Sequence, residues 1–502
     1  MKISSINWGD DSAEKDPNLL HYFISQDAID RLSQKQKSIV VGRKGAGKSA
    51  VRKKLSRPLK NPPCDRRTLF QRPVSETFSS SESQHVLNLS PKFQSIKTIL
   101  NDKDLTSGMG EEILFTHTWL RQIYLDCLCV VGHGERNKLS ANSFEFARGV
   151  ANQQNRTSKD LAENIADVIT RVKGKVANLG EFGINIEREL RNVADVDALE
   201  HHFLEIAKSI KFVVLVDDLD LGWNNSETAN NLILGLLTAA NYIASKTNNA
   251  FVCVFLREDV YSILITKTQH SDKYRNIERL RWEKESLIEL LGERINFNRR
   301  QAGEPELDSP FSSVFPLTIG TSNTDNWLVE RTLSRPRELI QLSRYYSERC
   351  ETETPDAEAL KAAEAGYSEW KLDDLCTEYS NQYPGLVDVF SYWKTKFYRY
   401  KYHLKYAEIE EMVLDIFIEA ELNQPWFNSL TDNVDVRGLM KILYEIGFIG
   451  DFVLGGDGGS KTFYSYQGNH QPRFDEIDIH PCFRKAVGTV DRIRAKSQET
   501  GA

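Results

Sequence analysis

The sequence lacks a long apolar run that is free of charged residues. Its most apolar long stretch, residues 113–131, carries His117, Arg121 and Asp126, and such side chains are costly inside a bilayer. The N-terminus begins Met-Lys-Ile-Ser-Ser and has no apolar core of a secretory signal. We therefore expect no membrane span and no membrane partner, and by elimination a cytoplasmic location.

Cysteines in metal-binding or disulfide patterns are also lacking. The seven cysteines are scattered and form no CxxC pair. Cys127 and Cys129 are separated by one residue and have no histidine partners at zinc spacing. This pattern predicts free thiols in a reducing compartment.

The chain has no overall excess of positive charge. Its formal net charge is −7 over 502 residues, with ordinary hydrophobic and charged contents of 40% and 27%, so nucleic acid would have to bind a local patch. Residues 52–72 hold eight Lys or Arg against one Asp, and residues 393–406 interleave lysines with aromatic residues. In the second stretch Trp393, Phe397, Tyr400 and Leu404 have the spacing of one helix face, which favours a face packed on a core. Direct DNA or RNA binding remains the alternative interpretation.

What the sequence does contain is a complete phosphate-binding loop. Residues 42–49 read Gly-Arg-Lys-Gly-Ala-Gly-Lys-Ser and follow a short predicted strand at 38–41. The glycines let successive backbone N–H groups point at phosphates, Lys48 can reach the outer phosphates, and the Ser49 hydroxyl can bind Mg²⁺. The predicted nucleotide contacts are Gly42, Arg43, Lys44, Gly45, Ala46, Gly47, Lys48, Ser49 and Ala50.

A second motif supplies carboxylates. Residues 213–216 are Val-Val-Leu-Val and precede Asp217-Asp218-Leu219-Asp220, which predicts a buried parallel strand that ends in acidic residues at the carboxyl edge of a sheet. There Asp217 can hold Mg²⁺ through water, and Asp218 can orient and polarise an attacking water. The two motifs together predict an Mg²⁺-dependent nucleoside triphosphatase.

Other apolar segments complete an α/β core. We predict strands at 85–90, 250–256 and 276–282, separated by helical stretches, which implies a mostly parallel sheet with helices on both faces. About 120 residues between Ser90 and Phe212 exceed the needs of a minimal core, and 111–131 and 158–172 have helical patterns there. We interpret this region as a helical insertion.

Arginines follow two later elements. Arg257 leaves the strand at 250–256 and can sense an outer phosphate, although a surface salt bridge with a nearby carboxylate is the plain alternative. Residues 332–340 predict a helix start, with Ser334 as its cap and Pro336 in its first turn. The two arginines there, Arg335 and Arg337, could reach into a cleft towards phosphate or be solvated.

The C-terminal region has the order helix, helix, hairpin. Helices are predicted at 408–422 and 435–447, and residues 448–467 alternate apolar and polar residues around a glycine-rich turn at 455–459. This order is typical of a winged helix. Such domains bind DNA in some proteins and partners in others, and here we favour a packing role.

The set of motifs resembles a poorly characterised family of bacterial P-loop ATPases. The phosphate loop, Val-Asp-Asp-Leu-Asp, Phe-Leu-Arg-Glu-Asp and Ser-Arg-Pro-Arg-Glu-Leu-Ile occur in its order. That family is of the STAND/AAA+ type and is distantly similar to KAP and origin-initiator ATPases. Residues 7–14 and 19–23 resemble its N-terminal signature, which lies near the adenine in related ATPases, and 479–485 resemble the end of origin-initiator-like ATPases.

The resemblance implies an ATP switch. Lys48, Asp217 and Asp218 would be catalytic, with Ser49 and Asp217 as metal ligands, Arg257 as sensor and Arg337 as lid arginine. The expected fold class is α/β: a P-loop NTPase core with a mostly parallel sheet and helical insertion, followed by a helical lid and a winged-helix-like C-terminal domain. The expected boundaries are a core at 1–283 with its insertion at about 91–205, a lid at 284–400, a winged-helix-like domain at 401–490 and a tail at 491–502.

Relatives of this kind often act in bacterial conflict systems, including antiphage defence. We therefore expect an ATP- and Mg²⁺-dependent switch that forms homo-oligomers and controls a separate effector protein, because no effector domain or repeat array is recognisable. A DNA-binding initiator or remodelling ATPase is the alternative function. A non-catalytic scaffold with a bound nucleotide is a third, against which the paired Asp217 and Asp218 argue.

Overall fold

The computed structural model describes residues 1–24, 27–56, 84–90, 111–136, 139–157, 170–171, 195–220, 223–268, 271–455, 459–468 and 470–490. They belong to two compact units. The sheet unit is Ser25–Leu280, and the helical unit combines Met1–Ile24 with Arg281–Ala502. Residues 1–24, which the sequence analysis assigned to the core, thus belong to the helical unit.

A parallel sheet forms the centre of the sheet unit. Among the described residues it has five strands in the order β2-β3-β4-β1-β5, and every pair of neighbours is parallel. The strands are β1 (Ile39–Gly42), β2 (Gln84–Leu89), β3 (Lys211–Val216), β4 (Ala250–Arg257) and β5 (Ile277–Arg279). The inner strands β3 and β4 are nearly continuous buried apolar runs, as expected for parallel strands covered on both faces. The predicted α/β fold with a mostly parallel sheet is confirmed.

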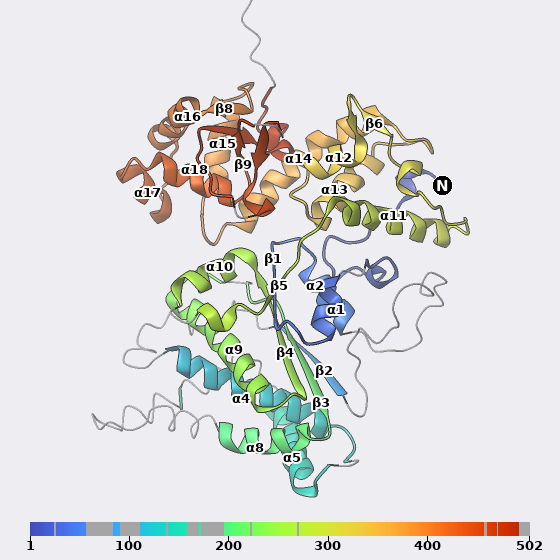
Figure 1. The fold of residues 1–502 in the computed structure, drawn as a ribbon, viewed down its shortest axis with the longest axis vertical. Coiled ribbons are helices and arrows are strands. Elements are labelled where there is room, and N and C mark those ends of the chain that lie inside the picture. The colour runs from blue at the N-terminus through green and yellow to red at the C-terminus, as the bar shows by residue number, and fades with distance from the viewer. Residues whose placement is uncertain are drawn as a thin grey trace, which may run out of the picture. The chain divides into compact units, whose positions relative to one another are not determined.

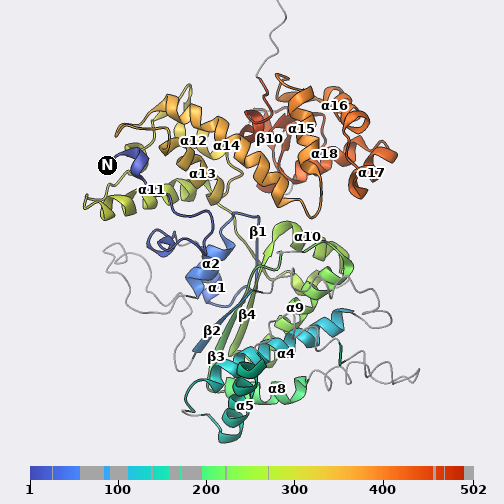
Figure 2. The same ribbon diagram turned by 180° about the vertical axis from the view of Figure 1, so that it is seen from behind.

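Helices cover both faces of this sheet. Figures 1 and 2 show α1 (Asp27–Ser33) and α2 (Lys48–Leu55) on the opposite side from α4 (Glu111–Gly132) and α9 (Glu227–Lys246). Further helical elements among the described residues of this unit are α5 (Ala141–Thr157), α8 (Val196–Ala207), α10 (Glu258–Lys267) and the short η5 (Ser271–Tyr274).

The helices α4 and α9 pack closely. A Cβ atom on Gly235 of α9 would lie 2.7 Å from the Cβ of Phe115, so only glycine permits this approach of the two backbones. The predicted helix at 111–131 is present as α4. The predicted helix at 158–172 lies outside the described residues except for Thr170 and Arg171.

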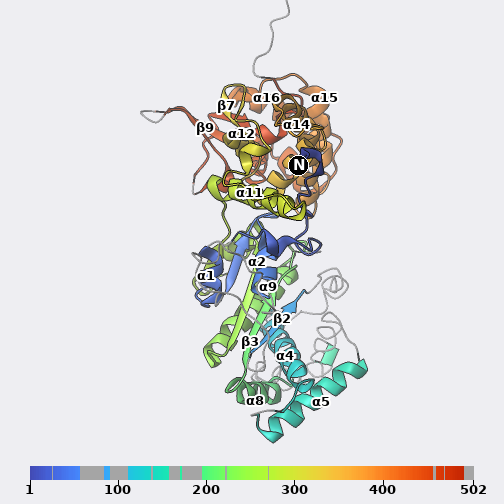
Figure 3. The same ribbon diagram turned by 90° about the vertical axis from the view of Figure 1, so that its right-hand side faces the viewer.

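The helical unit begins with the N-terminal segment, which contains η1 (Ile3–Ser5) and η2 (Leu19–His21). This segment lies beside α11 (Lys284–Gln301) in Figure 3. The indole Nε1 of Trp8 donates to Ser347 Oγ at 2.9 Å, and the backbone N–H of Asn7 donates to Asn298 Oδ1 at 2.8 Å. The N-terminal signature is thus tied to helices that come some 280 or more residues later in the chain.

Further elements of the helical unit precede its C-terminal sheet. They are η6 (Phe311–Ser313), β6 (Thr318–Ile319), β7 (Ser322–Asn323), α12 (Thr324–Glu330), α13 (Pro336–Ser347), α14 (Ala357–Glu378) and α15 (Leu386–Lys396). One continuous hydrophobic core joins them to the C-terminal part of the unit.

The C-terminal part is built on an antiparallel sheet with the strand order β10-β9-β11-β8. Its elements are β8 (His403–Lys405), α16 (Tyr406–Glu419), α17 (Pro425–Asp432), α18 (Val436–Glu445), β9 (Ile449–Val453), β10 (Lys461–Phe463), η7 (Ser465–Gln467), β11 (Glu476–Ile479) and α19 (Pro481–Arg484). The predicted hairpin is present as β9 and β10. The sequence analysis missed α17, which begins at Pro425, a residue suited to the first helical position.

Two local predictions were wrong. Residues 393–406 are not one helix, because α15 ends at Lys396, Arg399 has a positive φ of 63° and the chain continues into β8. Ser334 does not cap α13. It has a φ of 52°, and the N-cap residue is Arg335, whose side chain makes no capping bond.

Within the described part of the chain, no helix combines the length and the apolarity that a membrane span requires. The six cysteines in that part are free thiols.

Candidate functional site

The phosphate-loop motif forms a turn between a strand and a helix. β1 ends at Gly42 and α2 begins at Lys48. Gly45 and Gly47 have positive φ angles of 79° and 96°, a backbone region that other residues adopt only at a cost. Gly47 is the N-cap of α2, and no side chain caps this end of the helix. The loop therefore presents an uncapped positive helix end, which suits an anion.

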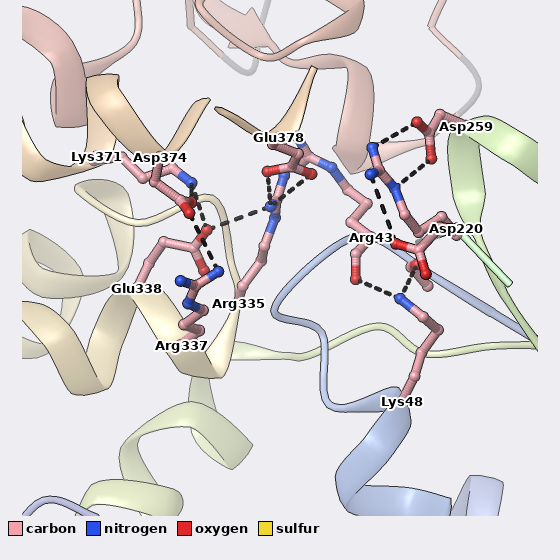
Figure 4. A network of polar contacts seen from close by, with 12 residues as sticks. Arg43, Lys48, Asp220, Asp259, Arg335, Arg337, Glu338, Lys371, Asp374 and Glu378 are labelled. Carbon is pink, nitrogen blue, oxygen red and sulfur yellow. Dashed lines mark hydrogen bonds and ion pairs between the residues drawn. The ribbon is translucent and has the colours of Figure 1, made fainter. Parts of the chain in front are cut away.

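Lys48 is folded back over the loop. Its Nζ donates to the carbonyl oxygens of Gly42 at 2.9 Å and Arg43 at 3.2 Å. Burial lowers the pKa of Lys48, while the carboxylates of Asp220 and Asp217 oppose this shift. The ammonium group is thus held at the loop among negative charges (Figure 4).

Ser49 and Asp217 meet across the carboxyl edge of the sheet. The Ser49 hydroxyl donates to Asp217 Oδ2 at 3.0 Å, and Arg52 Nε lies 3.1 Å from the same oxygen. Burial and the neighbouring Asp218 raise the pKa of Asp217, whereas Arg52 and Lys48 lower it, and the net shift is upward. A hydroxyl and a carboxylate are the oxygen ligands that Mg²⁺ uses beside phosphates, so these residues fit the predicted metal.

Asp218 is held by the strand on the other side of β3. It has a positive φ of 62°, and the hydroxyl of Ser90, just after β2, donates to its Oδ2. The backbone N–H of Asp217 also donates to the carbonyl of Leu89 at 3.0 Å. The end of β2 therefore sets the geometry of both adjacent carboxylates.

Arg257 ends β4, the strand that lies between β1 and β3 in the sheet. Its guanidinium forms a two-point ion pair with Asp259, with distances of 3.1 and 2.7 Å, and its NH1 lies 3.7 Å from Asp220 Oδ2. The side chain is 11% exposed. Arg257 thus forms the salt bridge with a nearby carboxylate that the alternative interpretation predicted. The pair is, however, largely buried and does not lie on the surface.

Arg337 belongs to the helical unit and is held in a buried charge network there. Its NH1 lies 3.2 Å from Asp374 Oδ1, and its guanidinium carbon lies 5.6 Å from the ring centre of Trp370. The neighbouring Arg335 is more deeply buried and pairs with Glu378 at 3.1 Å. Lys371, fully buried, pairs with Glu338 and Asp374 (Figure 4).

The sequence analysis assigned no role to several residues around the site. They are Arg52, Ser90, Asp220 and Asp259. Asp220 belongs to the Val-Asp-Asp-Leu-Asp motif and Asp259 to the Phe-Leu-Arg-Glu-Asp motif, so both could have been identified as candidates from the sequence. Arg52 lies three residues after Ser49 on α2, a spacing that places both on one helix side. Ser90 carried no signal, because its role depends on the pairing of β2 with β3.

The structure describes only part of the two basic stretches, and several lysines in the second stretch are in ion pairs. Residues 57–72 of the first lie outside the described residues. In the second, Lys394 pairs with Glu369, Lys396 with Glu419 and Lys401 with Glu408. Trp393, Phe397 and Leu404 are buried and Tyr400 is partly buried against the same core, which agrees with their predicted place in a core.

Comparisons with known proteins match parts of this arrangement. Residues 285–376 match the model of a FunZ-associated C-terminal helical domain. They include nearly all of α11, all of α12 and α13, and most of α14. An Escherichia coli (strain K12) protein described as "Putative transposon gamma-delta 80.3 kDa protein" is 23% identical over 499 residues, 95% of this chain. The chain spans 66% of the length of this curated relative. The chain is thus similar to a FunZ-associated helical domain over residues 285–376 and distantly similar to a larger transposon protein over nearly its whole length.

Proposed function

We propose that this protein is an ATPase that binds ATP with Mg²⁺, hydrolyses it and acts as a molecular switch. Its nucleotide state would control self-assembly and a separate effector, in bacterial antiphage defence. In this proposal the sheet unit is a P-loop NTPase core of the STAND/AAA+ type with a helical insertion, and the helical unit supplies the lid and a winged-helix-like domain. The observation that carries the proposal is the 3.0 Å contact between Ser49 and Asp217 beside the loop that holds Lys48.

The residues divide the work as phosphoryl transfer requires. Lys48 would leave the carbonyls of the loop to bind the outer phosphates, and Ser49 and Asp217 would hold the metal, which screens phosphate charge. Asp218 would orient and polarise the attacking water. Its bond from Ser90 fixes the carboxylate, so that little reorganisation is needed when water binds.

The alternative function, a DNA-binding initiator or remodelling ATPase, would use the same phosphate chemistry. The name of the E. coli relative places that protein on a transposon and does not say what it binds. Residues 401–490 contain 8 Lys or Arg against 14 Asp or Glu, a net charge of −6. Because nucleic-acid affinity depends on cationic contacts with phosphates, this acidic C-terminal part favours a protein-packing role over DNA binding.

The test is ATP hydrolysis by the purified full chain with Mg²⁺. We expect slow turnover that Lys48→Ala and Asp218→Asn each reduce by about 100-fold or more, the scale of losing one group that acts on transition-state charge. Asp272→Asn is the matched control, since Asp272 is an exposed carboxylate in η5 of the same unit. Turnover that equals wild type in the Lys48→Ala variant would refute the proposal.

A further inference from the structure

The predicted sensor arginine is held by two carboxylates for which the reaction as proposed has no use. Asp259 binds the Arg257 guanidinium at two points, and Asp220 lies 3.7 Å from its NH1. The three side chains are 11%, 20% and 30% exposed for Arg257, Asp259 and Asp220. Figure 4 labels both carboxylates, and dashed lines mark their contacts with the arginine.

Asp220 and Asp218 belong to the same acidic motif but have different partners. Asp220 Oδ2 lies 3.7 Å from NH1 of Arg257. Asp218, by contrast, accepts a bond from Ser90 after β2, on the other side of β3. One carboxylate of the acidic motif therefore lies beside the arginine that would sense an outer phosphate, while another is held by the neighbouring strand.

We propose that Asp220 makes the site discriminate between nucleoside triphosphate and diphosphate, by competing with the terminal phosphate for Arg257. This inference rests on the proposed nucleotide site. A triphosphate must displace Asp220 from Arg257 before its terminal phosphate can bind this arginine. A diphosphate leaves the contacts of Asp220 and Asp259 with Arg257 intact, so that the switch would have two electrostatic states set by the same arginine.

Charge balance explains why a carboxylate suits this task. An anion held 3.7 Å from a guanidinium in a partly buried site stabilises the arginine without phosphate. When phosphate replaces it, the carboxylate is left beside a like charge, which is unfavourable. Both effects weaken triphosphate binding and leave diphosphate binding nearly unchanged. Removal of the Asp220 charge should therefore favour the triphosphate selectively.

The experiment measures the affinities of the full chain for Mg²⁺-ATP and Mg²⁺-ADP by calorimetry, in the wild type and in Asp220→Asn. We expect Asp220→Asn to raise the ratio of ATP affinity to ADP affinity by about tenfold, the scale of one charged contact. The matched control Asp272→Asn should leave the ratio unchanged. In an Arg257→Ala background, Asp220→Asn should change the ratio by about threefold or less, because the cation for which it competes is gone.

Two outcomes would overturn the inference. An unchanged ratio in Asp220→Asn, with both nucleotides bound in a Lys48-dependent manner, would show that Asp220 does not discriminate while the proposed nucleotide site stands. A loss of turnover in Asp220→Asn with an unchanged ratio would instead make Asp220 a catalytic group. If Lys48→Ala binds both nucleotides as the wild type does, the proposed function itself fails. Thermal unfolding of each variant confirms that it is folded.

Discussion

At the scale of single residues, Gly9 and Gly303 share a backbone conformation but differ in their surroundings. Both have positive φ angles, 84° and 73°, and both lie in the helical unit. A Cβ atom on Gly9 would lie 2.5 Å from Asp16 Oδ2 and 2.6 Å from the hydroxyl of Tyr22, whereas one on Gly303 would meet nothing within 4 Å. The buried contacts of Gly9 therefore add a packing requirement to a conformational one.

The difference between these two glycines predicts how much an alanine at each position lowers the stability of the protein. Gly303→Ala should lower the free energy of unfolding by about 1 kcal/mol, the cost of a side chain in the left-handed region. Gly9→Ala should lower it by about 2–4 kcal/mol, because overpacking of the buried Asp16, Tyr22 and Arg294 adds to that cost. Urea unfolding of both variants measures the difference. Equal losses would mean that the N-terminal segment moves to accept the methyl group.

Local motifs and long-range contacts differ in how well the sequence predicts them. Lys48, Ser49, Asp217 and Asp218 were identifiable because their motifs are local and each predicted role depends on a few adjacent positions. Arg294, by contrast, meets Asp16 and Tyr22 only because residues 1–24 dock on α11. No local spacing encodes that contact across 272 or more residues, so the sequence could not reveal it.

At the scale of elements, Ser368 joins α14 to the end of the chain. Its hydroxyl donates to the carbonyl of Cys482 at 2.6 Å and accepts from the N–H of Ala486 at 2.9 Å, and the side chain is fully buried. One hydroxyl thus satisfies two backbone groups at α19, which closes the C-terminal part against α14.

Replacement of Ser368 should detach this end selectively. Ser368→Ala leaves a buried carbonyl and a buried N–H without their partner, and each such group costs about 1–3 kcal/mol. We expect faster amide hydrogen exchange in residues 476–487 and a lower unfolding midpoint. Thr377→Ala is the matched control, since its hydroxyl bonds within α14 at an exposed position. Unchanged exchange in Ser368→Ala would show that the apolar core alone holds α19.

Element boundaries show the limit of periodicity. The spacing of Trp393, Phe397 and Leu404 correctly marked residues that face a core, but it did not distinguish one helix from a helix and a strand that line the same core. The structure uses α15 and β8, which pairs with β11. That pairing joins residues some 70 positions apart, so the strand has no signal within its own three residues.

At the scale of the whole molecule, the distribution of charge favours a protein partner over a nucleic acid. The chain carries a net charge of −7, and residues 401–490 alone carry −6. Three lysines of the aromatic-rich stretch, Lys394, Lys396 and Lys401, are paired with Glu369, Glu419 and Glu408. A nucleic acid that binds this stretch would have to break these pairs, and the net negative charge of residues 401–490 would also oppose its binding.

We therefore expect neither duplex nor single-stranded DNA to stimulate ATP turnover by more than about twofold. Non-specific affinity for DNA comes from cationic side chains that neutralise phosphates, and few such contacts would form. Turnover is measured at 50 and 200 mM salt with each DNA, since true phosphate contacts would weaken steeply, by about 10³-fold or more for six of them, over this range. Lys394→Glu should likewise leave turnover unchanged. Stimulation that is strong at low salt, absent at high salt and lost in Lys394→Glu would favour the initiator or remodelling function, because it would show that the paired lysines exchange their carboxylates for phosphates.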